Sequence, residues 1–180
     1  MLNFYKLIEI LISLQTLLIS TMIPVYIPLP FIGKSSNSLD LPITWQIPTI
    51  ILLTIVFNRT VVYRAFTIYI ILGLFIIPVF NQGGSIGYLL TPNFGYLLGI
   101  YPLIKIIDNL NKKNSFYAII TMHLIGIFFN LLQIIYYNQF NIFIYNIGKY
   151  SVGRIGYHLI LLIPLMILVK PIKYLKYNND

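Results

Sequence analysis

The sequence predicts an all-α integral membrane protein, in which a bundle of about six transmembrane helices forms one domain over residues 1–180. Hydrophobic residues make up 58% of the chain and charged residues only 9%. The mean hydropathy of +0.85 is too high for an ordinary soluble domain. At about 20 residues per crossing, a chain of this length holds about six helices and no sizeable soluble domain.

The apolar runs place these helices along the chain. The expected spans are 5–28, 41–57, 61–80, 87–107, 115–136 and about 152–169. The first begins with Lys6 and Glu9 and no cleavage site follows it, so we interpret it as a retained helix rather than a signal peptide. Closely spaced prolines near its end, Pro24 to Pro30, favour an extended segment there.

The connections between the later spans are short and polar. Pro42, Thr44 and Trp45 fit the outer end of the second helix, since proline and tryptophan are common at helix starts and membrane interfaces. Residues 58–60 form a very short turn, and residues 108–114 form a basic connection. A stretch rich in Tyr, Asn and Phe, up to about Ser151, is expected to be a loop before the last helix.

Positive charges predict the orientation, because Lys and Arg are retained on the cytoplasmic side. Of the 12 lysines and arginines, all but Lys34, Lys149 and Arg154 fall on the side of the termini. The others are Lys6, Arg59, Arg64, Lys105, Lys112, Lys113, Lys170, Lys173 and Lys176. Both termini are therefore expected in the cytoplasm, with the third loop and the start of the sixth helix on the outer face.

Several classes of chemistry are disfavoured. There is no cysteine, and His123 and His158 are too far apart in sequence to suggest a metal site. The four acidic residues lie at span ends or outside spans, so no catalytic carboxylate pair or Ser-His-Asp set is indicated. The basic residues are scattered at helix ends, so nucleic acid is not an expected partner. We expect neither an enzyme nor a protein with a bound cofactor.

Residues 78–99 stand out from this apolar background, because they concentrate glycines, prolines, amides and aromatic rings between two spans. Glycine allows a ligand to approach the main chain, and amides and rings supply hydrogen bonds and flat surfaces. A shaped binding loop and a plain turn between two helices both fit this composition.

Four segments in this order resemble the BioY family of biotin transporters, the substrate-binding S components of energy-coupling-factor systems. They are residues 27–31 (IPLPF), 41–46 (LPITWQ), 73–80 (ending IPVF) and 84–99 (ending GYLLG). The resemblance implies capture of biotin, as transported substrate, at the outer face. It also implies delivery driven by a transmembrane coupling protein and two cytoplasmic ATPases, since this chain has no phosphate loop.

The chain also departs from the family pattern. His158 stands where the family has an acid or amide, and Ile, Asn, Lys and Tyr replace many small residues. This drift is typical of AT-rich genomes, so the expected location is the plasma membrane of a bacterium, including a cyanobacterium, or a plastid membrane.

Biotin's ureido ring has two N–H donors and one carbonyl acceptor, which carboxamides can match, and its carboxylate calls for a cation. The glycines would let the loop close over the solute, and the tyrosines would pack on its rings. The predicted substrate contacts are Thr44, Gln46, Asn81, Gln82, Gly83, Gly84, Tyr88, Asn93, Gly95, Tyr96, Arg154 and His158. Local turn bonds for the asparagines, an aromatic belt for the tyrosines and lipid headgroups for Arg154 and His158 remain alternatives.

The resemblance also implies that the first helix contacts the coupling protein through small residues, for which Ser13, Thr16 and Ser20 are the candidates. His123 and Asn130, seven residues apart on one helix face, are interpreted as structural. Two other functions remain as alternatives, namely an S component for another vitamin and a structural subunit of a membrane complex. Convergence of Gln46, Asn81, Tyr96 and the start of the sixth helix on one cavity would favour capture of a substrate.

Overall fold

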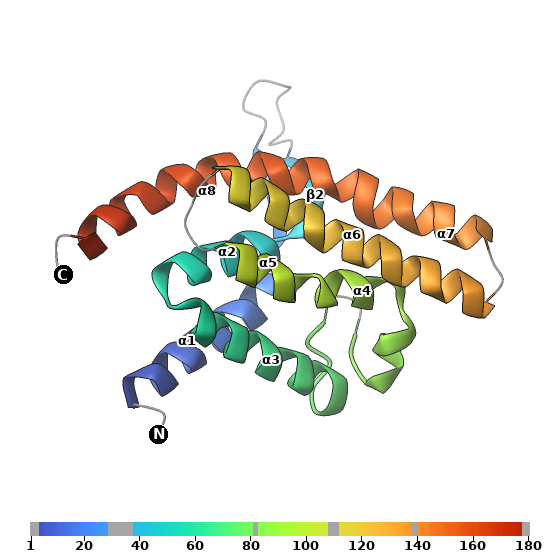
Figure 1. The fold of residues 1–180 in the computed structure, drawn as a ribbon, viewed down its shortest axis with the longest axis horizontal. Coiled ribbons are helices and arrows are strands. Elements are labelled where there is room, and N and C mark those ends of the chain that lie inside the picture. Colours follow the sequence, from blue (N-terminus) through green and yellow to red (C-terminus); the bar gives the residue numbers. More distant parts are fainter. Residues whose placement is uncertain (1–3, 29–37, 81–82, 108–111, 138–139, 178–180) are drawn as a thin grey trace.

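The computed structural model describes residues 4–28, 38–80, 83–107, 112–137 and 140–177. They form a helical bundle with one projecting hairpin (Figure 1). The elements are α1 (Phe4–Met22), β1 (Pro24–Pro28), β2 (Ser38–Thr44), α2 (Gln46–Val56), α3 (Arg59–Phe75), the 3₁₀ turn η1 (Ile86–Leu90), α4 (Pro92–Leu98), α5 (Ile100–Ile106), α6 (Lys112–Tyr137), α7 (Phe140–Ile147), the π-helical turn η2 (Gly148–Val152) and α8 (Gly153–Tyr177).

These elements confirm the predicted all-α membrane bundle of about six helical segments, with α4–α5 and α7–η2–α8 each counting as one. Within the described residues, three helices are long and apolar enough to cross a membrane, namely Phe4–Met22, Asn114–Ile134 and Phe140–Val169. The start of α1 and the end of α8 lie at the same end of the bundle, as an even number of crossings requires (Figure 1).

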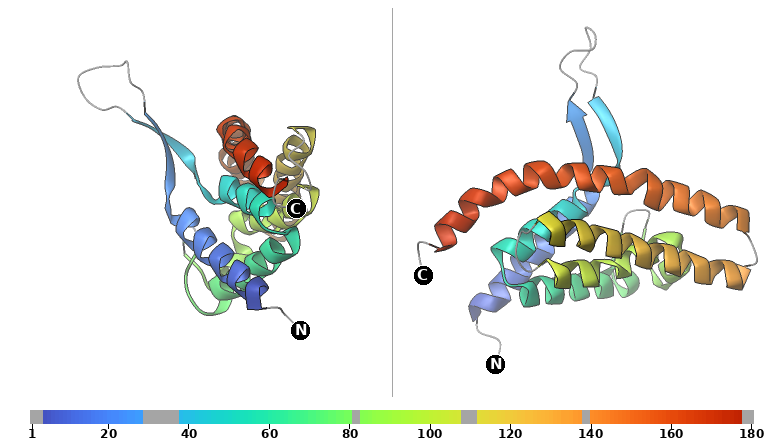
Figure 2. Two further views of the ribbon diagram at one scale, coloured as in Figure 1. Left: turned by 90° about the vertical axis from the view of Figure 1, so that its left-hand side faces the viewer. Right: turned by 45° about the horizontal axis from the view of Figure 1, so that its top comes forward.

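The hairpin corrects one predicted boundary. Residues 38–44 pair antiparallel with β1, so the second helix begins at Gln46 and not at residue 41. The prolines of β1 favour this extended backbone, as the sequence predicted. At the base of the hairpin, Val25 and Ile43 are buried against Leu161 of α8. The rest of the hairpin stands away from the helices (Figure 2).

The stretch before the last span is helical rather than a loop. Helix α7 begins at Phe140 and continues through η2 into α8 without a break. Its apolar residues face outward, with Phe140 61% and Ile144 58% exposed, whereas Asn146 is buried. This is the reverse of a soluble amphipathic helix, and it suits a helix whose outer face contacts lipid. The loop predicted from the Tyr, Asn and Phe content of this stretch is therefore wrong.

Two other predicted spans are shorter or broken. Helix α3 ends at Phe75, five residues before the predicted end, and the chain leaves the helix ahead of Pro78. The fourth span is divided at Gly99 into α4 and α5. The chain after α3 is exposed, with Ile76 68% and Ile77 51% exposed, whereas Gly99 keeps right-handed helical angles with φ of −62° and ψ of −16°.

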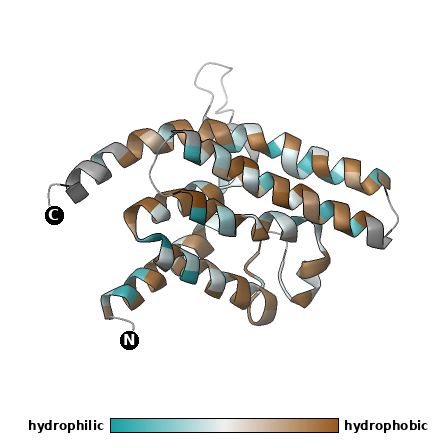
Figure 3. Cartoon of the chain, in the orientation of Figure 1, coloured by the Kyte–Doolittle hydropathy of each residue, from teal (hydrophilic) through white to brown (hydrophobic). Residues whose placement is uncertain are grey.

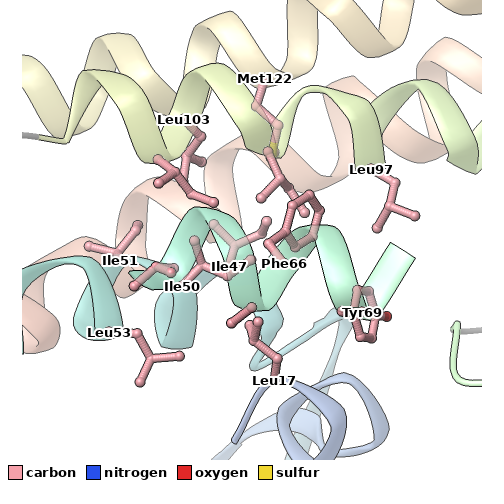
Figure 4. Close-up of a cluster of buried hydrophobic side chains, with 14 of the residues drawn as sticks. Leu17, Ile47, Ile50, Ile51, Leu53, Phe66, Tyr69, Leu97, Leu103 and Met122 are labelled. Carbon is pink, nitrogen blue, oxygen red and sulfur yellow. The ribbon is translucent and has the colours of Figure 1, made fainter. Parts of the chain in front are cut away.

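The core lies where α1, α2, α3, α5 and α6 converge. Its most buried side chains have 0% exposure and pack between these helices (Figure 4); they include Leu17, Ile50, Phe66 and Leu103. Large apolar residues also cover the outer helix surfaces (Figure 3), as expected for a protein surrounded by lipid. Several polar side chains are nevertheless buried inside the bundle, including His123, Asn130 and His158.

Candidate functional site

A cavity opens in the half of the bundle away from the termini, where the start of α2, the end of α3, α4, α6 and η2–α8 meet. Its empty space is about 690 Å³, part of which is open solvent at the mouth. It is lined by Ile43, Thr44, Gln46, Ile47, Tyr69, Phe80, Tyr88, Asn93, Tyr96, Leu97, Ile100, Met122, His123, Tyr150, Arg154 and His158. Rings and aliphatic chains thus surround a few polar groups, the usual composition of a small-molecule site.

Three aromatic rings form one wall. The ring centroids of Tyr69 and Phe80 are 5.4 Å apart, and those of Phe80 and Tyr88 are 4.6 Å apart. The fully buried Tyr69 hydroxyl accepts hydrogen bonds from Thr21 Oγ1 and Gln46 Nε2, both at 3.3 Å. The Gln46 amide at the cavity edge is therefore held in place by the ring wall.

Tyr88 lies in the turn before α4 and contributes a buried phenol to this wall. Burial raises the pKa of Tyr88, although a side-chain hydrogen bond with Asn93 partly offsets the shift. Its hydroxyl thus keeps its proton through the neutral and mildly alkaline range, and Tyr88 with Asn93 offers a neutral group that can donate and accept.

Tyr96 links α4 to the opposite side of the cavity. Its hydroxyl and Ser151 Oγ, in η2, are 2.7 Å apart. Its ring meets that of His123 edge-on at 5.7 Å and lies 6.1 Å from that of Tyr150. Since its partners come from two other elements, Tyr96 of α4 contacts both α6 and η2 around the cavity.

Two histidines on neighbouring helices form a buried pair. His123 Nε2 of α6 lies 3.1 Å from His158 Nδ1 of α8, and the two side chains are 2% and 8% exposed. In a neutral pair, one of these nitrogens donates and the other accepts. If His123 donates, His158 Nε2 carries a proton; if His158 donates, its Nε2 is an acceptor. The pair can therefore offer either a donor or an acceptor from His158 to a polar solute.

Arg154 is the one cation among the lining residues, and no carboxylate lines this cavity within the described part of the chain. Its guanidinium lies 4.8 Å from the Tyr150 ring centroid, and its Nε is buried without a hydrogen-bond partner among the described residues. A guanidinium recognises carboxylates through paired N–H groups. Arg154 therefore equips the cavity to bind an anionic group.

The structure brings together many of the predicted contacts. Those that line the cavity are Thr44, Gln46, Tyr88, Asn93, Tyr96, Arg154 and His158. Asn81 and Gln82 lie outside the described residues. Lys149 does not line the cavity, but its Nζ lies 5.3 Å from the centroid of the Tyr150 ring.

Three of the predicted glycines, Gly83, Gly84 and Gly95, are not among the residues that line the cavity, and their local packing explains why they are glycine. A Cβ at Gly84 would lie 2.5 Å from Pro78 Cα, and one at Gly95 would lie 2.3 Å from Phe129 Cβ. Gly83, with φ of +120°, turns the chain so that its N–H donates to Phe80 O. These glycines permit close backbone approach in the turn and between α4 and α6.

Two of the three residues predicted as a partner surface on α1 are buried within this chain. Ser13 and Ser20 are 0% and 4% exposed, because this side of α1 packs on α3 within the same chain. Thr16 is partly exposed, and its hydroxyl donates to Ile12 O of its own helix. The small residues thus allow a close helix contact, as expected, but inside the chain.

The sequence interpretation missed several lining residues. His123 was assigned a structural role, although an ionisable group within a span is a recognised sign of a functional site. Tyr150 fell in the supposed loop, and Tyr69, Phe80 and Met122 are ordinary apolar residues of their spans. Of these, only His123 carried a signal in the sequence.

Comparisons with known proteins agree on one relationship. The model of the BioY family matches residues 3–168. A probable biotin transporter BioY of Lysinibacillus sphaericus is 38% identical over 73 residues, or 41% of this chain and 33% of that protein. The match thus spans about a third of the curated relative's length.

The crystal structure of the S-component for biotin from an ECF-type ABC transporter is similar over 94% of this chain and 95% of that chain. The TM-score is 0.53 and the sequence identity 20%, so this likeness concerns the fold.

Proposed function

The chain belongs to the BioY family, and from this premise we propose that it captures biotin in the cavity and passes it inward. It would do so as the S component of an energy-coupling-factor transporter, with a coupling protein and ATPases as partners and the bacterial plasma membrane as its location. The supporting observation is the convergence of Gln46, Tyr96 and the start of α8 on one cavity. A structural subunit has no need for such a cavity.

The cavity chemistry fits the two ends of biotin. The ureido ring needs both acceptors and donors, which Gln46, Asn93 and His158 supply. The rings of Phe80 and Tyr88 suit the fused bicycle, and Arg154 suits the carboxylate. The rival function is an S component for another vitamin. The polar groups of that vitamin, instead of those of biotin, would then have to match the same lining residues.

The direct test is equilibrium binding of radiolabelled biotin to the purified protein in detergent, with riboflavin and thiamine as competitors. Saturable binding that neither competitor displaces would support capture of biotin. If the folded protein binds no biotin, or riboflavin or thiamine displaces it, the proposed substrate is wrong.

We predict that Gly126→Ala weakens biotin binding about tenfold, because it moves a cavity wall. A Cβ at Gly126 would lie 2.2 Å from Tyr96 Cδ1, so the ring and its hydrogen bond to Ser151 must shift. Gly156→Ala is the matched control, since nothing lies within 4 Å of a Cβ there. Equal affinities of the two variants would show that the position of Tyr96 does not matter.

We also predict that His123 and His158 act as a unit. His158→Leu removes the polar group that faces the ligand, and His123→Leu removes the hydrogen-bond partner that orients it. Each change is expected to cost about 1–2 kcal/mol of binding free energy, and the double variant little more than either alone. Biotin titrations of the four proteins measure this coupling, and additive losses would mean that the residues act independently.

A further inference from the structure

A second groove opens on the side of the bundle between η1–α4, α6 and α7. Its empty space is about 600 Å³, including open space at the mouth. It is lined by Leu90, Pro92, Asn130, Gln133, Ile134, Ile142, Phe143 and Asn146. None of these residues lines the biotin cavity, so the groove is a separate feature.

Asn130 gives this groove a buried polar atom with no partner. The side chain is 2% exposed, and its Nδ2 donates to Gly126 O at 2.9 Å and to Pro92 O at 3.3 Å. Because both neighbours are carbonyl oxygens, the amide orientation is fixed by its hydrogen bonds. Its Oδ1 is then an acceptor, and no hydrogen-bond donor reaches it from the described residues.

The surroundings define what would satisfy this oxygen. Asn146 is a second buried amide in the groove, and Gln133 donates through Nε2 to Leu90 O at 2.8 Å. Among the residues that the structure describes, no charged side chain lines this groove. A neutral hydroxyl can donate to Asn130 and accept from another amide. A charged group buried beside Asn130 would lack a countercharge among the described lining residues, so any charge on the bound molecule lies outside the groove.

The location of the groove indicates where such a hydroxyl comes from. Asn130 and Gln133 lie within a helix long and apolar enough to span the membrane, Asn114–Ile134. Large apolar side chains border the groove and point outward, with Leu90 63% and Ile142 50% exposed. In a membrane protein such a surface faces lipid. The nearest source of a hydroxyl is therefore a lipid headgroup rather than a dissolved solute.

We propose that this groove binds the hydroxyl-bearing headgroup of a membrane lipid. The headgroup hydroxyl donates to Asn130 Oδ1, and the adjoining alkyl portion packs on Ile142 and Phe143. The inference rests on Asn130 and the groove lining alone and does not depend on biotin being the substrate.

Native mass spectrometry of the full chain in detergent, with added lipid, tests the proposal. The probes are dioleoylphosphatidylglycerol, whose headgroup has two hydroxyls, and dioleoylphosphatidylethanol, which has the same charge and tails but no headgroup hydroxyl. Free glycerol tests whether the hydroxyls bind without a lipid tail. We expect the phosphatidylglycerol adduct to be retained at least about fivefold better than the phosphatidylethanol adduct, as one buried hydrogen bond would give.

Two variants on α7 locate the adduct. Ile142→Trp fills the groove from its edge, and Ile144→Trp adds the same ring at an exposed position outside the lining. We expect the selective adduct to be lost only in Ile142→Trp. Equal retention of the two lipids, survival of the selective adduct in Ile142→Trp, or selective binding of free glycerol would each overturn the proposal. Radiolabelled biotin binding by the same preparations shows whether the biotin cavity is intact, so the two proposals fail separately.

Discussion

Arg154→Gln is expected to weaken biotin binding about 100-fold, or about 2.7 kcal/mol, because among the described residues it removes the only cation that lines the cavity. Glutamine keeps the polar character and much of the length of the side chain. The paired, charged hydrogen bonds to the carboxylate are lost, and such bonds are worth more than neutral ones. Titration of the purified variant with radiolabelled biotin measures the effect.

Biotinamide, in which the carboxylate is replaced by a neutral amide, separates recognition from structure. The unchanged protein should bind biotinamide far more weakly than biotin, and Arg154→Gln should bind the two about equally. Lys149→Gln is the matched control, because Lys149 lies near the Tyr150 ring but does not line the cavity. If Arg154→Gln lost affinity equally for both ligands, Arg154 would act by supporting Tyr150 and not by binding the carboxylate.

The sequence predicted the helices well because apolar runs of membrane length leave few alternatives. It failed at α7, where Asn146 faces the interior and Phe140 and Ile144 face outward. The asparagines and tyrosines of that stretch suggested a loop, but in lipid the exposed face of a helix is the apolar one. The π-helical turn η2, which carries Tyr150 into the cavity, was missed for the same reason.

Whether a predicted site residue lines the cavity depends on the property for which it was chosen. Those chosen for their hydrogen-bonding side chains, such as Gln46, Asn93 and Arg154, do line the cavity. The glycines chosen for flexibility do not, since Gly84 and Gly95 are determined by close packing. A single sequence does not distinguish a glycine that admits a ligand from one that admits a neighbouring helix. The two histidines are 35 residues apart in sequence, and their pairing depends on how α6 crosses α8. A single sequence does not predict this crossing either.

The largest effect on stability is expected from Gly99→Ala, at the point where the fourth span is divided into α4 and α5. A Cβ there would lie 2.5 Å from the Met122 carbonyl oxygen and 2.9 Å from Met122 Cα. These are backbone atoms of α6, so no side-chain rotation relieves the contact and the helices must move apart. We expect a loss of about 3 kcal/mol, at the upper end for an overpacked interior.

Thermal unfolding of the purified variants in one detergent measures this loss, with Gly148→Ala as the control. No atom lies within 4 Å of a Cβ at Gly148, so that change should leave the unfolding temperature the same or slightly higher. Gly99→Ala should unfold at a temperature lower by about 6 °C or more. Equal unfolding temperatures would mean that α5 and α6 have room between them at Gly99. Because Ile100 and Met122 both line the cavity next to this contact, the variant should also bind biotin more weakly even where it remains folded.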